Sequence, residues 1–171
     1  MRFNHFQKSF IAIGLIAIVI LFTGCPYSSS VPIDEGTVSV PAGLTGQWVS
    51  TADTASENPT YFVIAASDKF HATARKMEYS AADSAFTETL YYLTFSDVNG
   101  ETFMNAKETE SETYSLFKFS LNEKASAIST SEITDYIKET FSTSKELKDF
   151  IAKNKSNSYF FTNSDETYIR K

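Results

Sequence analysis

The stretch ETLYYLTFSDVNGETFMNA, residues 88–106, decides the fold. Its first half places Tyr91, Leu93 and Phe95 at alternate positions, the period-two pattern of a strand with one apolar face. The pair Asn99-Gly100 follows, and this dipeptide supplies the two positive-φ residues that a tight hairpin turn requires. The sequence on either side of the pair is therefore predicted to form two antiparallel strands.

Further runs of strand length lie on both sides of this hairpin. They are rich in aromatic and β-branched residues, which suit a pleated, half-buried surface. The predicted strands are residues 46–50, 60–67, 70–79, 88–96, 101–106, 112–121 and 125–129, and a last hairpin pairs 158–161 with 167–170 around Asn163-Ser164-Asp165. The fold class is therefore mainly β (a β-rich α+β fold), as a meandering antiparallel sheet or barrel.

Two short helices are predicted before that last hairpin. In residues 129–141, Ser129 and Glu132 have the spacing of a capping box. The apolar residues that follow fall at i, i+3, i+4 and i+8, one face of a helix: Ile133, Tyr136, Ile137 and Phe141. Thr143 and Glu146 repeat the capping spacing, and the apolar stripe of this second helix is Leu147, Phe150 and Ile151.

The N-terminus has the three parts of a secretory signal. Arg2 and Lys8 are basic, the run from Ile11 to Phe22 is uncharged, and the small residues Thr23-Gly24 close it. A membrane-spanning helix needs roughly 20 apolar residues, so this run of 12 residues is too short to span. Residues 1–24 are therefore predicted to be a cleaved signal peptide.

The segment Phe22-Thr23-Gly24-Cys25 resembles the lipobox of bacterial lipoproteins, and Cys25 is the only cysteine of the chain. The resemblance implies cleavage between Gly24 and Cys25, acylation of the thiol, and a lipid anchor in the membrane of the cell envelope. Because Pro26, not Asp, follows the cysteine, the resemblance favours the outer membrane. The alternative is an ordinary signal peptide with an incidental cysteine.

The remaining chain is acidic. Loss of Arg2 and Lys8 lowers the basic count from 15 to 13 while the acidic count stays at 21, a formal net charge of −8. Nucleic-acid partners require basic patches, so they are not expected. Residues 25–43, the lipidated cysteine and a segment rich in Pro and Ser, are predicted to form a flexible tether, whose 18 residues from position 26 would span about 24 Å. Residues 44–171 are then a single domain.

The motif Gly46-Gln47-Trp48 opens the first predicted strand and resembles the Gly-x-Trp of lipocalins and other calycin-type barrels. The order of elements over residues 44–171 is also similar to that of lipocalin-like bacterial lipoproteins. The resemblance implies that Trp48 and Gly46 lie in the core at the barrel floor and that the barrel holds a small apolar ligand. The alternative is a structural or interaction protein of the envelope with a filled core.

No motif of an enzyme or cofactor site is present, so we expect neither catalysis nor a cofactor. His5 leaves with the signal peptide, and His71 alone cannot assemble a zinc site. Glu108, Glu110 and Glu112 share a face if extended, but they lack the glycine-punctuated spacing of a calcium loop. We therefore predict no metal site and assign these carboxylates to a solvated strand edge.

Overall fold

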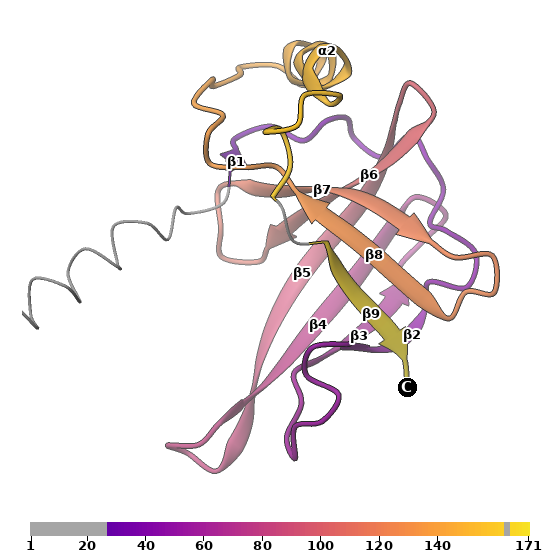
Figure 1. Cartoon of the computed structure of the whole chain (residues 1–171), viewed down its shortest axis with the longest axis vertical. Helices are drawn as coiled ribbons and strands as arrows, with labels where there is room; N and C mark the ends of the chain where they lie inside the picture. The colour runs from indigo at the N-terminus through magenta and orange to yellow at the C-terminus, as the bar shows by residue number, and fades with distance from the viewer. Residues whose placement is uncertain (1–26, 163–164) are drawn as a thin grey trace, which may run out of the picture.

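The computed structural model describes residues 27–162 and 165–171, and shows a closed eight-stranded antiparallel barrel with one strand and one helix outside it (Figure 1). Strands β2 to β9 follow one another around the barrel, and β9 pairs with β2 to close it. The elements are β1 (Ser28–Ser29), β2 (Gly46–Ser50), β3 (Tyr61–Ala66), β4 (His71–Ser80), β5 (Ala85–Val98), β6 (Glu101–Glu108), β7 (Tyr114–Leu121), β8 (Ala127–Glu132), α2 (Ser144–Asn154) and β9 (Glu166–Arg170). The mainly β fold class is confirmed.

The hairpin predicted from Asn99-Gly100 is confirmed. Asn99 has φ 54° and Gly100 has φ 81°, so both turn positions have the positive φ that the dipeptide favours. The turn sets the register of β5 against β6, in which Phe95 lies opposite Met104 and Leu93 opposite Ala106. These four side chains all belong to the apolar cluster inside the barrel.

The barrel closes through its last strand, which corrects the predicted terminal hairpin. Residues 158–161 do not form a strand that pairs with 167–170; Phe161 makes one isolated bridge to Ile133. β9 instead lies between β2 and β8. An open edge on β2 or β8 would leave a row of unpaired backbone groups, and the last strand fills both edges at once.

The first of the two predicted helices is wrong. Residues 127–132 form β8, and residues 134–142 continue as irregular chain. Ser and Thr are weak helix formers, and β8 is needed as the partner of both β7 and β9. Ile133 and Ile137 are buried as the periodicity required, but Tyr136 of the same predicted stripe is 75% exposed.

The second predicted helix is confirmed as α2, with its complete capping box. The Thr143 hydroxyl accepts a hydrogen bond from the backbone N–H of Glu146, and the Glu146 carboxylate accepts one from the Thr143 N–H. No helix in the described part of the chain is both long and apolar enough to cross a bilayer.

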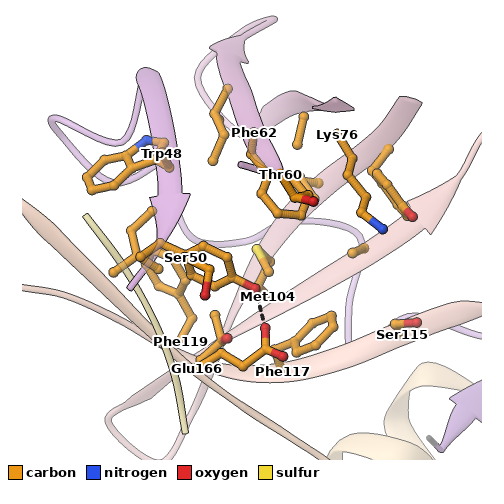
Figure 2. A pocket seen from close by; sticks show the side chains of 18 of the residues that line it. Trp48, Ser50, Thr60, Phe62, Lys76, Met104, Ser115, Phe117, Phe119 and Glu166 are labelled. Carbon is orange, nitrogen blue, oxygen red and sulfur yellow. Dashed lines mark hydrogen bonds between the residues drawn. The ribbon is translucent and has the colours of Figure 1, made fainter. Parts of the chain in front are cut away.

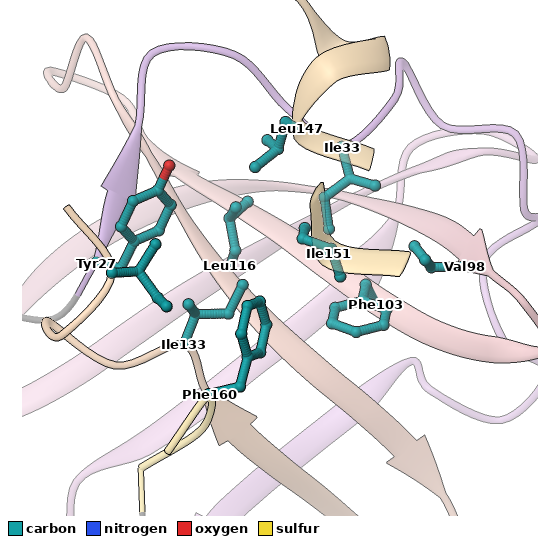
Figure 3. Close-up of a cluster of buried hydrophobic side chains, with 10 residues drawn as sticks. Tyr27, Ile33, Val98, Phe103, Leu116, Ile133, Leu147, Ile151 and Phe160 are labelled. Carbon is teal, nitrogen blue, oxygen red and sulfur yellow. The ribbon is translucent and has the colours of Figure 1, made fainter. Parts of the chain in front are cut away.

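The buried side chains form two separate clusters, one inside the barrel and one on its outer wall. The outer cluster fills the space between the wall, α2 and the N-terminal segment (Figure 3). Its fully or nearly buried members are Tyr27, Ile33, Val98, Phe103, Leu116, Ile133, Ile137, Leu147, Ile151 and Phe160. The interior therefore need not be solid for the domain to have a substantial core.

Residues 27–43 pack on the barrel and are not the flexible tether that their composition predicted. β1 pairs with the start of β7, and Ile33 and Ser29 are buried. The Ile33 N–H donates to Oδ1 of the buried Asn105 at 2.8 Å. Scattered apolar residues with no periodicity give little signal in a sequence, yet Tyr27, Val31 and Ile33 pack in the outer cluster, and Val38 and Val40 pack against the inner one.

Two ion pairs fasten the α2 region, one to the N-terminal segment and one to the barrel wall. Lys148 of α2 donates to Asp34 Oδ2 at 2.9 Å, and Lys155 forms an ion pair with Glu101. Burial would raise the pKa of Asp34, but hydrogen bonds from Lys148, Ser96, Thr37 and Gly36 outweigh it and hold that pKa below its usual value. The outer layer is therefore fixed by charge as well as by apolar contact.

Candidate functional site

A cavity of about 460 Å³ occupies the inside of the barrel (Figure 2). Every one of the eight barrel strands contributes alternate residues to its wall, as the period of a strand dictates. The lining residues are Trp48, Ser50, Asp53, Thr60, Phe62, Ile64, Ala74, Lys76, Tyr91, Leu93, Met104, Ala106, Ser115, Phe117, Phe119, Ile128, Thr130, Glu166 and Tyr168. Most of these are apolar or aromatic, so the wall suits an apolar occupant.

Trp48 lies at the floor of the cavity and is 1% exposed. Its indole N–H donates to the Leu44 carbonyl oxygen at 2.7 Å, so the one polar atom of the ring is satisfied in the core. Arg170 stacks over the ring with its guanidinium carbon 4.6 Å from the ring centroid. The end of the barrel that begins with β2 is thereby closed.

Gly46 is required beside this stack. Its φ is +144°, which side-chain-bearing residues rarely adopt, and a Cβ there would clash with the Arg170 guanidinium. The guanidinium donates to the backbone carbonyl oxygens of Thr45, at 2.9 Å, Ala125, at 3.0 Å, and Gly43. Sequence analysis selected Gly46 and Trp48 but missed Arg170, because only the β2–β9 register places it there.

The polar residues of the cavity gather toward the other end, the mouth. Lys76 reaches into the cavity in Figure 2, and its ammonium group forms an ion pair with Glu78 at 2.7 Å. Glu166 accepts a hydrogen bond from the Tyr168 hydroxyl, and Asp53 accepts one from the Thr60 N–H at 2.5 Å. The mouth therefore carries more carboxylates than cations.

Burial and these neighbours shift the pKa values of titratable groups at the mouth. Burial raises the pKa of the Glu132 carboxyl, and the nearby Glu166 carboxylate raises it further. Burial and the hydrogen bond to Glu166 raise the pKa of the Tyr168 hydroxyl well above its usual value. Burial and the charge of Glu108 likewise raise the pKa of Tyr91. The two tyrosines therefore remain neutral hydroxyls at neutral pH.

The other sequence candidates do not assemble a site. His71 is exposed on β4, and its Nδ1 lies 2.8 Å from Asp68 Oδ2. Glu108 ends β6, and Glu110 and Glu112 lie in the turn after it. Among the described residues, no three His, Cys, Asp or Glu side chains are grouped as a metal site. Gly24 and Cys25 lie outside the described residues.

A second hollow, of about 370 Å³, lies outside the barrel, in the segment between β8 and β9. Thr134, Asp135, Tyr136, Ser158, Tyr159, Phe161 and Thr162 line it. Tyr136 and Tyr159 are 75% and 54% exposed. Aromatic residues therefore stand out from the surface beside the end of β8.

Comparison with models of known families, with curated proteins and with solved structures found no match to this chain. The closed barrel with consecutive antiparallel neighbours is consistent with a lipocalin-like architecture. The order of the elements differs from that of a true lipocalin, because α2 precedes the last strand of the barrel instead of following it. The function is therefore argued from the cavity.

Proposed function

We propose that this protein is a lipid-anchored lipoprotein of the bacterial cell envelope whose barrel binds a small apolar molecule. The observation that carries the binding role is the interior cavity. Its volume of about 460 Å³ lies within the roughly 300–1,000 Å³ that ligand pockets usually have. The outer cluster supplies a core of its own, so a hollow interior is compatible with a stable domain. This favours a binding role over the filled-core alternative.

The wall chemistry supports a neutral ligand, or one with a single polar end. Phe62, Phe117 and Phe119 offer apolar surface inside the barrel, and the charged residues of the lining are Asp53, Lys76 and Glu166. The carboxylates of Asp53 and Glu166 at the mouth disfavour an anionic head group. The hydroxyls of Tyr91 and Tyr168 supply hydrogen-bonding groups where a polar end would lie.

The anchor rests on the lipobox resemblance of Phe22-Thr23-Gly24-Cys25. Two or more acyl chains hold a protein stably on a membrane, whereas one chain binds only marginally. The residue after the cysteine, Pro26, favours the outer membrane. Under this proposal the domain needs no catalytic residue, and the partners are the membrane and the ligand.

The test of the binding role uses N-phenyl-1-naphthylamine, a neutral apolar dye that fluoresces when it leaves water. We expect saturable binding of about one dye per protein. Ala106 points into the cavity, so Ala106→Phe should fill part of it and weaken dye binding at least several-fold. Ala65→Phe is the matched control, because Ala65 is exposed on β3 and the same ring there leaves the cavity unchanged. Equal binding by all three proteins, or none by the wild type, would contradict the proposal.

A further inference from the structure

The chain is fixed to the barrel almost immediately after the proposed lipid attachment site. Tyr27 is 8% exposed; its N–H donates to the Ile133 carbonyl oxygen at 3.3 Å and its hydroxyl to the Glu139 carbonyl oxygen at 3.1 Å. Ser28 and Ser29 then pair with Ser115 and Tyr114 at the start of β7. Tyr27 is therefore held at the barrel surface from its backbone to its ring tip.

Covalent geometry limits how far Cys25 can lie from the attached residue Tyr27. Two residues of fully extended chain span at most about 7 Å, so Cys25 cannot lie farther than that from Tyr27. The flexible tether expected from composition would have allowed about 24 Å and every orientation. An acylated Cys25 would instead hold the barrel directly against the bilayer, at one defined point of its surface.

That point lies beside the mouth of the cavity. Ser115, the register partner of Ser28, is itself a lining residue. β2 and β8 both run from the floor at Trp48 to the mouth, where they end at Ser50 and Glu132. β7 is antiparallel to β8, so β7 starts at the mouth. Figure 1 shows β1 beside this end of β7, next to the chain that follows β8.

Exposed aromatic rings gather at the same end. Tyr136 and Tyr159 lie just beyond the end of β8, where the Thr134 hydroxyl donates to the Tyr159 carbonyl oxygen at 2.9 Å. Across the mouth, Phe86 is 40% exposed at the start of β5. Its ring packs 5.4 Å from that of Tyr79 and 5.6 Å from that of Tyr61. Tyrosine is enriched at membrane–water interfaces because its ring is apolar and its hydroxyl polar.

We infer that the mouth end of the barrel is a bilayer-docking surface. The anchor beside β1 and the exposed residues Tyr136, Tyr159 and Phe86 orient the mouth of the cavity toward the membrane. This inference rests on the proposed lipidation of Cys25. It assigns the source of the ligand: an apolar molecule dissolved in the bilayer enters the barrel without crossing water. The acidic turn with Glu110 and Glu112 lies at the same end, so the surface fits neutral head groups better than anionic ones.

The experiment uses the full-length protein, purified from membranes and reconstituted into phosphatidylcholine vesicles that carry a nitroxide on some head groups. Single cysteines for an environment-sensitive dye are placed at the mouth end (Ala82→Cys and Lys138→Cys) and at the floor end (Lys124→Cys), all at exposed positions. We expect nitroxide quenching to be several-fold stronger at the two mouth positions than at the floor. Equal quenching, or stronger quenching at the floor, would overturn the inference.

A spacer variant tests the cause. A flexible Gly/Ser insert of about 20 residues between Pro26 and Tyr27 would span roughly 25 Å and release the barrel from the anchor point. Quenching at the mouth positions should then fall toward the floor value; undiminished quenching would refute the role of the short connection.

The mass of the N-terminal peptide separates the two proposals. An unmodified Cys25 removes both the anchor and this inference, whereas an acylated Cys25 with equal quenching refutes this inference alone.

Discussion

Arg170 and Trp48 lie opposite each other in the β9–β2 pair, with the guanidinium carbon 4.6 Å from the centroid of the indole ring. One residue begins the barrel and the other ends it. The same guanidinium satisfies carbonyl oxygens on either side of the stack, among them those of Thr45 and Ala125. The floor is thus held by a single side chain from the last strand.

Replacing Arg170 should therefore loosen the floor. A cation–π contact contributes about 0.5–1 kcal/mol at exposed sites, and each lost hydrogen bond about 0.5–1.5 kcal/mol. We expect Arg170→Ala to lower the free energy of unfolding by about 2–5 kcal/mol on these figures. Arg170→Lys keeps the charge but not the several N–H donors of the guanidinium, so its free energy of unfolding should lie between those of the wild type and Arg170→Ala. An unchanged denaturation midpoint in Arg170→Ala would contradict the role.

Trp48 should be the more sensitive member of the pair. Trp→Ala in a core costs about 3–5 kcal/mol, a large share of a domain's usual 5–15 kcal/mol. We expect Trp48→Ala to fold poorly and Trp48→Phe to be mild. As the only tryptophan, Trp48 should emit at short wavelength and resist aqueous quenchers. Free quenching of the wild-type emission would be inconsistent with its position in the floor.

Acid should weaken the attachment of α2. The pKa of Asp34 is lowered in the folded state by Lys148 and its other donors, and that of Glu101 by Lys118 and Lys155. The stabilisation is complete above the ordinary carboxyl pKa of about 4 and is lost as the pH falls through the lower folded values. Chemical denaturation at a series of pH values should show this loss. Asp34→Asn should show a smaller loss below pH 5 than the wild type does.

Deletion of the last strand should open the barrel. β9 supplies the partner of both β2 and β8, so removing residues 166–171 exposes two edges at once. We expect a large fall in melting temperature and a tendency to aggregate. The Arg170→Ala variant is the control, because it weakens the floor while the strand stays in place. A truncated protein that melts with the wild type would show that the sheet closes without β9.

Membrane attachment should depend on the cysteine. Wild-type protein is expected in the membrane fraction with the mass of an acylated N-terminus. Cys25→Ser should be released or remain as the uncleaved precursor. Identical fractionation and mass shift in both proteins would refute the lipobox interpretation of residues 22–25. Folding of the barrel should be the same in either case, since Tyr27 and the residues after it supply the N-terminal part of the outer cluster.

Most of the barrel strands were predictable because each of them carries a pattern that is local in sequence. Residues 46–50 match β2, and the Asn-Gly turn marks the start of β6. The cavity wall was only partly predictable: the alternation shows which side chains share a face, but the eight strands must close before that face becomes an interior. Lys76 gave no signal that it would reach into an apolar barrel.

The errors share a physical cause. In residues 129–141 the helical spacing of Ile133 and Ile137 reflects one buried side, but the barrel needed the preceding residues as a strand, and tertiary pairing overrode the local pattern. In residues 26–43 the Pro and Ser content suggested a linker, whereas Tyr27 and Ile33 find partners only on strands that come much later in the chain. A local sequence pattern does not show which residues far along the chain will become packing or pairing partners.

The β2–β9 pair also has a consequence for the order of events in folding. More than a hundred residues separate Trp48 from Arg170, so the contact that closes the sheet is among the least local in the chain. Contacts of this kind incur the entropy of loop closure before they stabilise anything, and sheets rich in them fold slowly. The barrel cannot close before the ribosome has added its last strand. A chain in which β9 has not yet paired is therefore an open intermediate, whose β2 and β8 edges are prone to aggregation.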